Sequence, residues 1–152
     1  MFRGVNGINI DAKGRIAMPT RYRDCLKNQS HGHIVMTIDT EERCLLLYPL
    51  GAWEDIENKL AALPSFNPAA RRIQRLLIGH ATETELDGNG RILLPPLLRE
   101  YAGLNKKIML VGQGKKFEIW DEDHWQERRG QWLDEESSSD GSLPDEVKTL
   151  SL

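Results

Sequence analysis

An aspartate, a glycine and an arginine recur twice at the same spacing in this 152-residue chain. Residues 10–19 read IDAKGRIAMP, and residues 86–95 read LDGNGRILLP. A carboxylate at this spacing can accept hydrogen bonds from the backbone of a tight turn. An arginine just after the turn can pair with that carboxylate or present its guanidinium to a guanine or a phosphate. We expect Asp11 and Asp87 to be turn residues rather than catalytic acids.

The two motifs lie within a longer internal repeat. At an offset of 76 residues, Ile16 matches Ile92 and Pro19 matches Pro95; further on, residues 33–39 match 107–113 and residues 44–53 match 116–125. Each half is predicted to contain strand, tight turn, strand, short helix, strand, turn, strand and helix, because short β-rich runs alternate with Gly, Asp and Pro. The chain is therefore a tandem duplication.

Glycine and proline set the predicted turns of each half. Gly14 and Gly90 stand where a tight hairpin needs a positive φ, which glycine adopts without steric cost. Pro19 and Pro95 lack an N–H group, so they end the second strand and allow a helix to begin.

Two helices are predicted between the halves. The first has apolar residues at helical spacing and is broken by Pro64; the second begins at Asn67 as N-cap. The second helix carries Arg71, Arg72 and Arg75. These arginines could contact phosphate, pair across a subunit interface or form a solvated face, and we favour the last two over phosphate.

Charge is unevenly distributed along the sequence. The formal net charge is −3, but residues 133–152 hold six acids and one base, so the remainder is mildly basic. Residues 1–24 hold five basic and two acidic side chains, whereas residues 80–101 hold two basic and four acidic ones. Two duplicates with opposite charge indicate different roles, and the cationic first arm favours nucleic acid as a partner.

The sequence also predicts a cytoplasmic protein. No apolar run approaches the length of a membrane-spanning helix, and the first residues lack the apolar region of a secretory signal. Cys25 and Cys44 have no metal-binding spacing, and we expect both to be buried, reduced thiols.

The motifs at residues 11–19 and 87–95, with Arg71-x-x-x-Arg75-x-x-x-Gly79 between them, resemble the MraZ family over residues 1–132. The resemblance implies an α+β, mainly β fold: tandem AbrB/SpoVT-like swapped-hairpin repeats that form a pseudo-dimeric, double-psi-like β core with linking and C-terminal helices. The expected boundaries are domain 1 at 4–52, a helical linker at 53–79, domain 2 at 80–125, the end of a C-terminal helix at 126–132 and an acidic flexible tail at 133–152.

The same resemblance implies a DNA-binding transcriptional regulator of the division and cell-wall gene cluster, a repressor that assembles into a homo-oligomeric ring. We expect it to be nucleoid-associated and to bind short promoter repeats in double-stranded DNA, since side-by-side hairpins gain avidity. The alternative is a protein-interaction or antitoxin-like module of the same fold.

Six basic side chains are the candidate DNA-binding residues: Arg3, Lys13, Arg15, Arg21, Arg23 and Arg91. A β-hairpin can enter the major groove, where arginine pairs with guanine in a bidentate manner. We favour this role for Arg15, with Lys13 and Arg3 on phosphates. For Arg91 we favour an ion pair with Asp87 that mainly holds the turn. The two roles are compatible, because an aspartate can orient the arginine that reads a base.

An enzymatic function finds no support in the sequence. The four histidines form none of the common catalytic or metal-binding patterns. Residues 87–90, DGNG, lack the alternating acids that a calcium loop requires. We therefore expect no catalytic residues, no metal, no cofactor and no membrane association.

Overall fold

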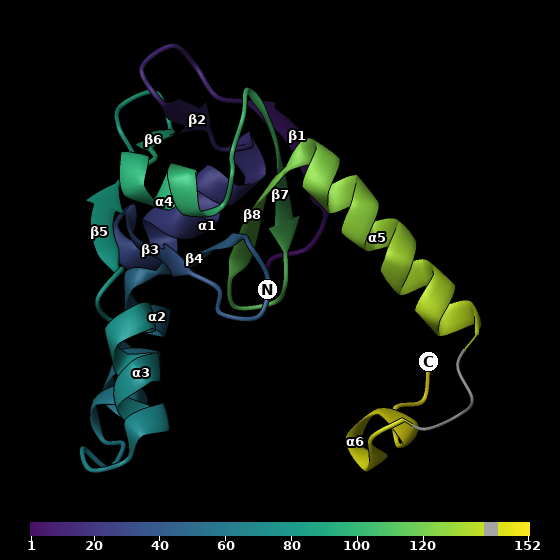
Figure 1. The fold of residues 1–152 in the computed structure, drawn as a ribbon. Helices are drawn as coiled ribbons and strands as arrows, with labels where there is room; N and C mark the ends of the chain where they lie inside the picture. The colour runs from purple at the N-terminus through teal and green to yellow at the C-terminus, as the bar shows by residue number, and fades with distance from the viewer. Residues whose placement is uncertain (139–142) are drawn as a thin grey trace. The chain divides into compact units, whose positions relative to one another are not determined.

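The computed structural model describes residues 1–138 and 143–152, in two compact units, Met1–Glu122 and Asp123–Leu152 (Figure 1). The second unit contains most of α5 (Glu122–Ser137) and all of α6 (Asp145–Lys148). Helix α5 runs past residue 132, where the sequence predicts its end. The expected acidic tail includes residues 139–142, which lie outside the described residues.

Six strands of the first unit form one antiparallel sheet, in the order β1-β7-β8-β4-β3-β5. Two further strands form a separate two-stranded ribbon, β2 with β6. The bounds of the sheet strands are β1 (Val5–Asn9), β3 (His33–Ile38), β4 (Leu45–Pro49), β5 (Thr82–Glu85), β7 (Lys107–Gly112) and β8 (Phe117–Asp121). The ribbon strands are β2 (Arg15–Ala17) and β6 (Arg91–Leu93), and the helices that follow them are α1 (Thr20–Ser30) and α4 (Pro96–Tyr101).

The two halves exchange their first strands. Strand β1 of the first half pairs with β7 of the second, and β5 of the second half pairs with β3 of the first. The equivalent strands of the two halves are β1 and β5, β7 and β3, and β8 and β4. If each strand is replaced by its equivalent, the strand order is read in reverse and every pairing is kept. The unit therefore has a pseudo-two-fold axis. The α+β fold of interleaved hairpins that the family resemblance implies is thereby confirmed.

The main hydrophobic core lies between the sheet and the ribbon. Ile16 and Ile92, equivalent residues of the two halves, are cross-strand partners and are both fully buried. A second, smaller cluster on the other face of the sheet contains Val35, Leu46 and Trp53. Neither half encloses the main core alone, because the ribbon that covers it takes one strand from each.

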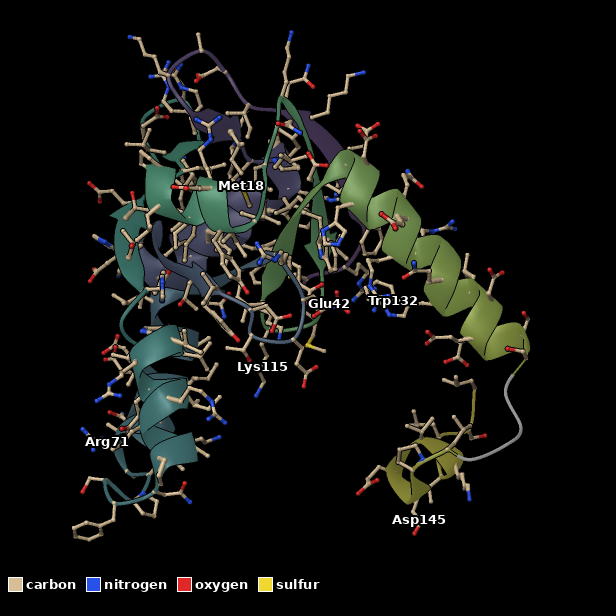
Figure 2. All side chains as sticks on the ribbon, viewed as in Figure 1. Met18, Glu42, Arg71, Lys115, Trp132 and Asp145 are labelled. Atoms are coloured by element: carbon tan, nitrogen blue, oxygen red, sulfur yellow. The ribbon has the colours of Figure 1, made fainter. Side chains whose placement is uncertain are left out.

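Helices α2 (Leu50–Ala61) and α3 (Pro68–Leu77) form an arm at the end of the first unit opposite the ribbon (Figure 1). The side chain of Asn67 caps α3 as predicted, accepting hydrogen bonds from the backbone N–H groups of Ala69 and Ala70. Leu76 and Leu77 pack against the two core clusters. The α3 arginines are exposed, and Figure 2 shows Arg71 far from Met18, which follows β2.

The two cysteines differ in burial. Both thiols are free; Cys44 is buried, but Cys25 is exposed, so the expectation of two buried thiols is wrong for Cys25. The reason is its place on α1, which turns Tyr22 and Leu26 toward the core and Cys25 away from it. Across residues 1–138 and 143–152, no helix has the length and apolarity needed to cross a bilayer.

The pairing of Ile16 with Ile92 predicts similar effects of mutation in either half. Truncating Ile16→Ala or Ile92→Ala removes buried methyl groups at the pseudo-two-fold axis and should lower the free energy of unfolding by about 2–5 kcal/mol. Urea unfolding of the full chain measures this. Phe66→Ala, at a side chain that is 94% exposed, should change it by less than about 0.5 kcal/mol. A clear loss for only one isoleucine would contradict a core shared equally by both halves.

Candidate nucleic-acid interface

Each Asp-x-x-Gly-Arg motif forms a turn organised around its aspartate. Oδ1 of Asp11 accepts hydrogen bonds from the backbone N–H groups of Lys13 and Arg15, both at 2.9 Å. Oδ2 accepts a third from Nε of Arg15, also at 2.9 Å. The carboxylate therefore holds the backbone of the turn and the arginine side chain together.

The second turn repeats this geometry. Oδ1 of Asp87 accepts hydrogen bonds from the N–H groups of Asn89 at 2.8 Å and Arg91 at 2.9 Å, and Oδ2 accepts one from Nε of Arg91 at 2.9 Å. The ion pair expected for Arg91 is thus present in both halves. It does not distinguish an arginine that contacts a base from one that only holds the turn.

Both turns need glycine, because the backbone has a positive φ there and a side chain would meet neighbouring atoms. Gly14 has φ +81° and Gly90 has φ +72°, a region that side chains other than glycine rarely occupy. A Cβ on Gly90 would lie 2.3 Å from Nε of Arg23, and one on Gly14 would lie 3.0 Å from Nη1 of Arg99. Each turn is therefore covered by an arginine from the other half.

Only one side of each guanidinium of Arg15 and Arg91 is used in the turns. In the described part of the chain, each bonds to its own aspartate through Nε. The edge that carries Nη1 and Nη2 is left for other contacts, and the side chains are 26% and 32% exposed. Because the Nε contact fixes the plane of the guanidinium, less side-chain entropy is lost when this edge binds.

The outer face of the β2–β6 ribbon brings both arginines onto one surface. The register pairs Arg15 with Leu93 and Ala17 with Arg91, so these four side chains share one face because cross-strand partners do. Ile16 and Ile92 point the other way, into the core. Figure 1 shows the ribbon at the top of the first unit, away from the α2–α3 arm.

The other candidate residues are spread along the molecule. Lys13 lies in the first turn. Arg23, which belongs in sequence to the first half, lies against the second turn, with its Nε donating to the carbonyl of Met18 at 2.6 Å.

Arg3 and Arg21 lie near β1 and are not brought to the ribbon. Nη2 of Arg21 donates to the hydroxyl of Tyr22 at 2.7 Å and to Oδ1 of Asn6 at 3.2 Å. The hydroxyl of Tyr22 donates in turn to the backbone carbonyl of Arg3.

Two basic residues beside the first turn were not identified from the sequence. Arg99 and Lys106 line a hollow of about 740 Å³ next to Asp11. The signal for Arg99 was available, because it matches Arg23 in the repeat and a swapped hairpin places each of these arginines on the turn of the other half. Counting charges along the sequence assigns each arginine to the turn nearest to it in sequence, and so does not show that the two arginines change places.

Hydrogen bonding lowers the pKa of both turn aspartates. The backbone N–H of Arg15 is the largest cause of the lowered pKa of Asp11, and the backbone N–H of Arg91 has the same effect on Asp87. Both groups are therefore charged at neutral pH and can orient their arginines.

One cluster has residue types that metals use. Ligand atoms of Asp39, Cys44 and Glu118 lie within 4.8 Å of one another. Burial raises the pKa of both the Cys44 thiol and the Glu118 carboxyl, and Oε1 of Glu118 accepts a hydrogen bond from Nε1 of Trp120 at 3.0 Å. Sγ of Cys44 also lies 3.7 Å from Oδ2 of Asp39, so hydrogen bonds within the protein already engage all three side chains.

Two halves with exchanged first strands and paired Asp–Arg turns define a swapped-hairpin protein of the AbrB-like class. The family model described as "MraZ protein, putative antitoxin-like" matches residues 1–76 and again residues 77–142. Proteins named "Transcriptional regulator MraZ" are 57% identical in Halorhodospira halophila, 61% in Coxiella burnetii and 59% in Legionella pneumophila, each over the full length of both chains. The chain belongs to the MraZ family.

The lowered pKa of the turn aspartates predicts how stability depends on pH. Because folding favours the charged carboxylate, Asp11 and Asp87 stabilise the fold above their ordinary pKa of 3.8. This contribution is lost as the pH falls from there through the lowered pKa values. Carboxyl ¹³C NMR should show both groups titrating below 3.8, and the double variant Asp11→Asn/Asp87→Asn should unfold with a weaker dependence on acid pH. Titration at or above 3.8 would contradict the hydrogen bonding described.

Proposed function

We propose that this transcriptional regulator binds double-stranded DNA by placing the β2–β6 ribbon in the major groove. The observation that carries the proposal is the pair of guanidinium edges that Asp11 and Asp87 leave available on one face. A two-stranded ribbon fits the major groove, and the Nη edge of arginine matches O6 and N7 of guanine. We assign base reading to both Arg15 and Arg91, since each makes the same Nε contact with its own aspartate.

We assign the phosphate contacts to the basic side chains around the turns. Lys13, Arg99 and Lys106 lie at the first turn, and Arg23 lies at the second. Arg3 and Arg21, farther along β1, are assigned outlying phosphates only. Each phosphate contact adds about 0.9 to the magnitude of the slope of log K against log salt.

The proposed biological role is inferred from membership of the MraZ family. We propose repression of the division and cell-wall gene cluster, exerted in the cytoplasm at the nucleoid through short promoter repeats. Membership in a family of named regulators decides against an enzyme. The antitoxin-like alternative, named in the family description, would use the fold to bind a protein.

Assembly of several copies into a ring would present several ribbons to repeated sites. The α2–α3 arm supports such a contact: it ends in Phe66, which is 94% exposed, and its exposed arginines 71, 72 and 75 form no ion pair with the described residues. At the base of the arm, a cleft of about 310 Å³ is lined by Trp53 and by three acidic side chains, Glu54, Glu57 and Glu83. Complementary surfaces at different places on one chain make a head-to-tail contact, which can close into a ring.

Substitution of the reading arginines should weaken specific binding. Arg15→Ala and Arg91→Ala should each cost about 1–3 kcal/mol in binding to a fragment of the upstream promoter region. Lys13→Ala should weaken binding to all sequences alike and lower the salt slope by about 1. Lys27→Ala, an exposed lysine of α1, is the control and should bind as the wild type does. Fluorescence anisotropy over a salt series measures both quantities.

Two results would remove the proposed DNA interface. One is an Arg15→Ala/Arg91→Ala double variant that binds the promoter as tightly as the wild type. The other is binding with no salt dependence, which would favour the protein-interaction alternative.

Charge reversal on the arm should break the assembly. The variant Arg71→Glu/Arg75→Glu should shift the protein to a smaller species in light scattering, because it repels the acidic cleft of the next copy. It should also lose the preference for fragments with several boxes over one box. Lys27→Glu/Lys115→Glu, at two exposed lysines outside the arm, changes the charge equally and is the control. An unchanged assembly in the arm variant, or a monomeric wild type, would refute this contact.

A further inference from the structure

The outer face of the β2–β6 ribbon departs from two-fold symmetry in the partner of each arginine. Arg15 and Arg91 are equivalent in the repeat, and each contacts its own aspartate through Nε. Their cross-strand partners differ, because Leu93 lies beside Arg15 and Ala17 lies beside Arg91. The surface next to Arg15 therefore carries an isobutyl side chain, whereas that next to Arg91 carries only a methyl group.

Leu93 is an exposed apolar side chain on the ribbon face that carries both arginines. It is 54% exposed, although Ile92 before it is fully buried. Its Cδ1 lies 3.9 Å from the position of a Cβ on Gly14, which places the side chain over the first turn. Single exposed leucines are common on protein surfaces; this one is distinguished by its position in register with a base-reading arginine.

The major groove offers one apolar group, the C5-methyl of thymine, and apolar side chains recognise it by contact. Directly opposed residues of an antiparallel pair have Cβ atoms about 5 Å apart, and successive bases of a DNA strand are about 3.4 Å apart. Two such side chains can therefore reach neighbouring base pairs at the same time.

We propose that Leu93 contacts the C5-methyl of a thymine in the base pair next to the guanine that Arg15 reads. Leu93 is then a specificity-determining residue on the Arg15 side of the site. Ala17 is too short to make the equivalent contact, so the Arg91 side accepts any base at the corresponding position. This inference rests on the proposed DNA-binding function and adds to it the identity of one neighbouring base.

The test removes the methyl group from the DNA and the side chain from the protein. The probe is a duplex of the upstream promoter region in which deoxyuridine replaces each thymine in turn, which changes the methyl group and leaves base pairing intact. When deoxyuridine replaces one particular thymine, beside a guanine protected by Arg15, the wild-type protein should bind about fourfold more weakly. This factor corresponds to the loss of one buried methyl-sized group. Leu93→Ala should lose a similar factor on unmodified DNA and become insensitive to deoxyuridine there.

The pseudo-two-fold axis provides the matched control. Ala17→Leu places the larger side chain beside Arg91 and should create sensitivity to a thymine methyl on that side of the site. Leu97→Ala removes an exposed leucine of α4, which is 63% exposed and outside the ribbon, and should leave the deoxyuridine response unchanged.

The outcomes separate this inference from the proposed function. If the wild type binds thymine and deoxyuridine duplexes equally at every position, or Leu93→Ala keeps the wild-type response, the role of Leu93 is wrong while the role of Arg15 stands on its own variant. If the wild type shows no sequence-specific binding to the promoter duplex, both are overturned. The deoxyuridine series on wild-type protein gives an answer that does not depend on how any variant folds.

Discussion

The first strand of each half is hydrogen-bonded to the other half, and the geometry of the interface depends on this exchange. The N–H of Met18 donates to the carbonyl of Gly90 at 3.0 Å, and the N–H of Leu94 donates to the carbonyl of Gly14 at 2.9 Å. Each turn glycine thus accepts a hydrogen bond from the residue that follows the ribbon strand of the other half. Because a buried polar group left without a partner costs about 1–3 kcal/mol, a change in one turn is transmitted to its counterpart. The two Asp–Arg motifs are one structural unit, although 76 residues separate them in the sequence.

The exchange also explains how a small fold can hold two arginines in fixed positions on one face. Residues 16 and 92 anchor the ribbon from below, so the side chains on its upper face stand on a rigid support. Each aspartate satisfies two backbone N–H groups and one guanidinium nitrogen, and its lowered pKa keeps it charged while it does so. Sites built on ordered strands hold their side chains more accurately than sites built on loops. The α2–α3 arm lies at the other end of the unit, which leaves the ribbon unobstructed by these helices.

Much of this arrangement could be predicted from the sequence because the repeat carries strong local signals. The position of Gly14 requires a turn, Pro19 ends the strand after it, and Asn67 caps the helix that begins the second half of the arm. Placement across the pseudo-axis was harder to predict. Arg23 is near the first turn in sequence, so charge patterning assigns it there. In the fold it lies against the second turn, because the two halves exchange strands. Counting charges along the chain therefore overstated the difference between the two turns, and it passed over Arg99 for the same reason.

Strand exchange has a consequence for the synthesis of the protein. Val5 pairs with Val111, so β1 leaves the ribosome about 100 residues before its partner strand exists. At about 5–20 residues per second, β1 waits about 5–20 seconds before its partner strand has been made. Helix α1 and the β3–β4 hairpin can form early in that interval, but the ribbon must wait for β6, which supplies half of it. A nascent chain consequently has no complete arginine surface until β6 has been made.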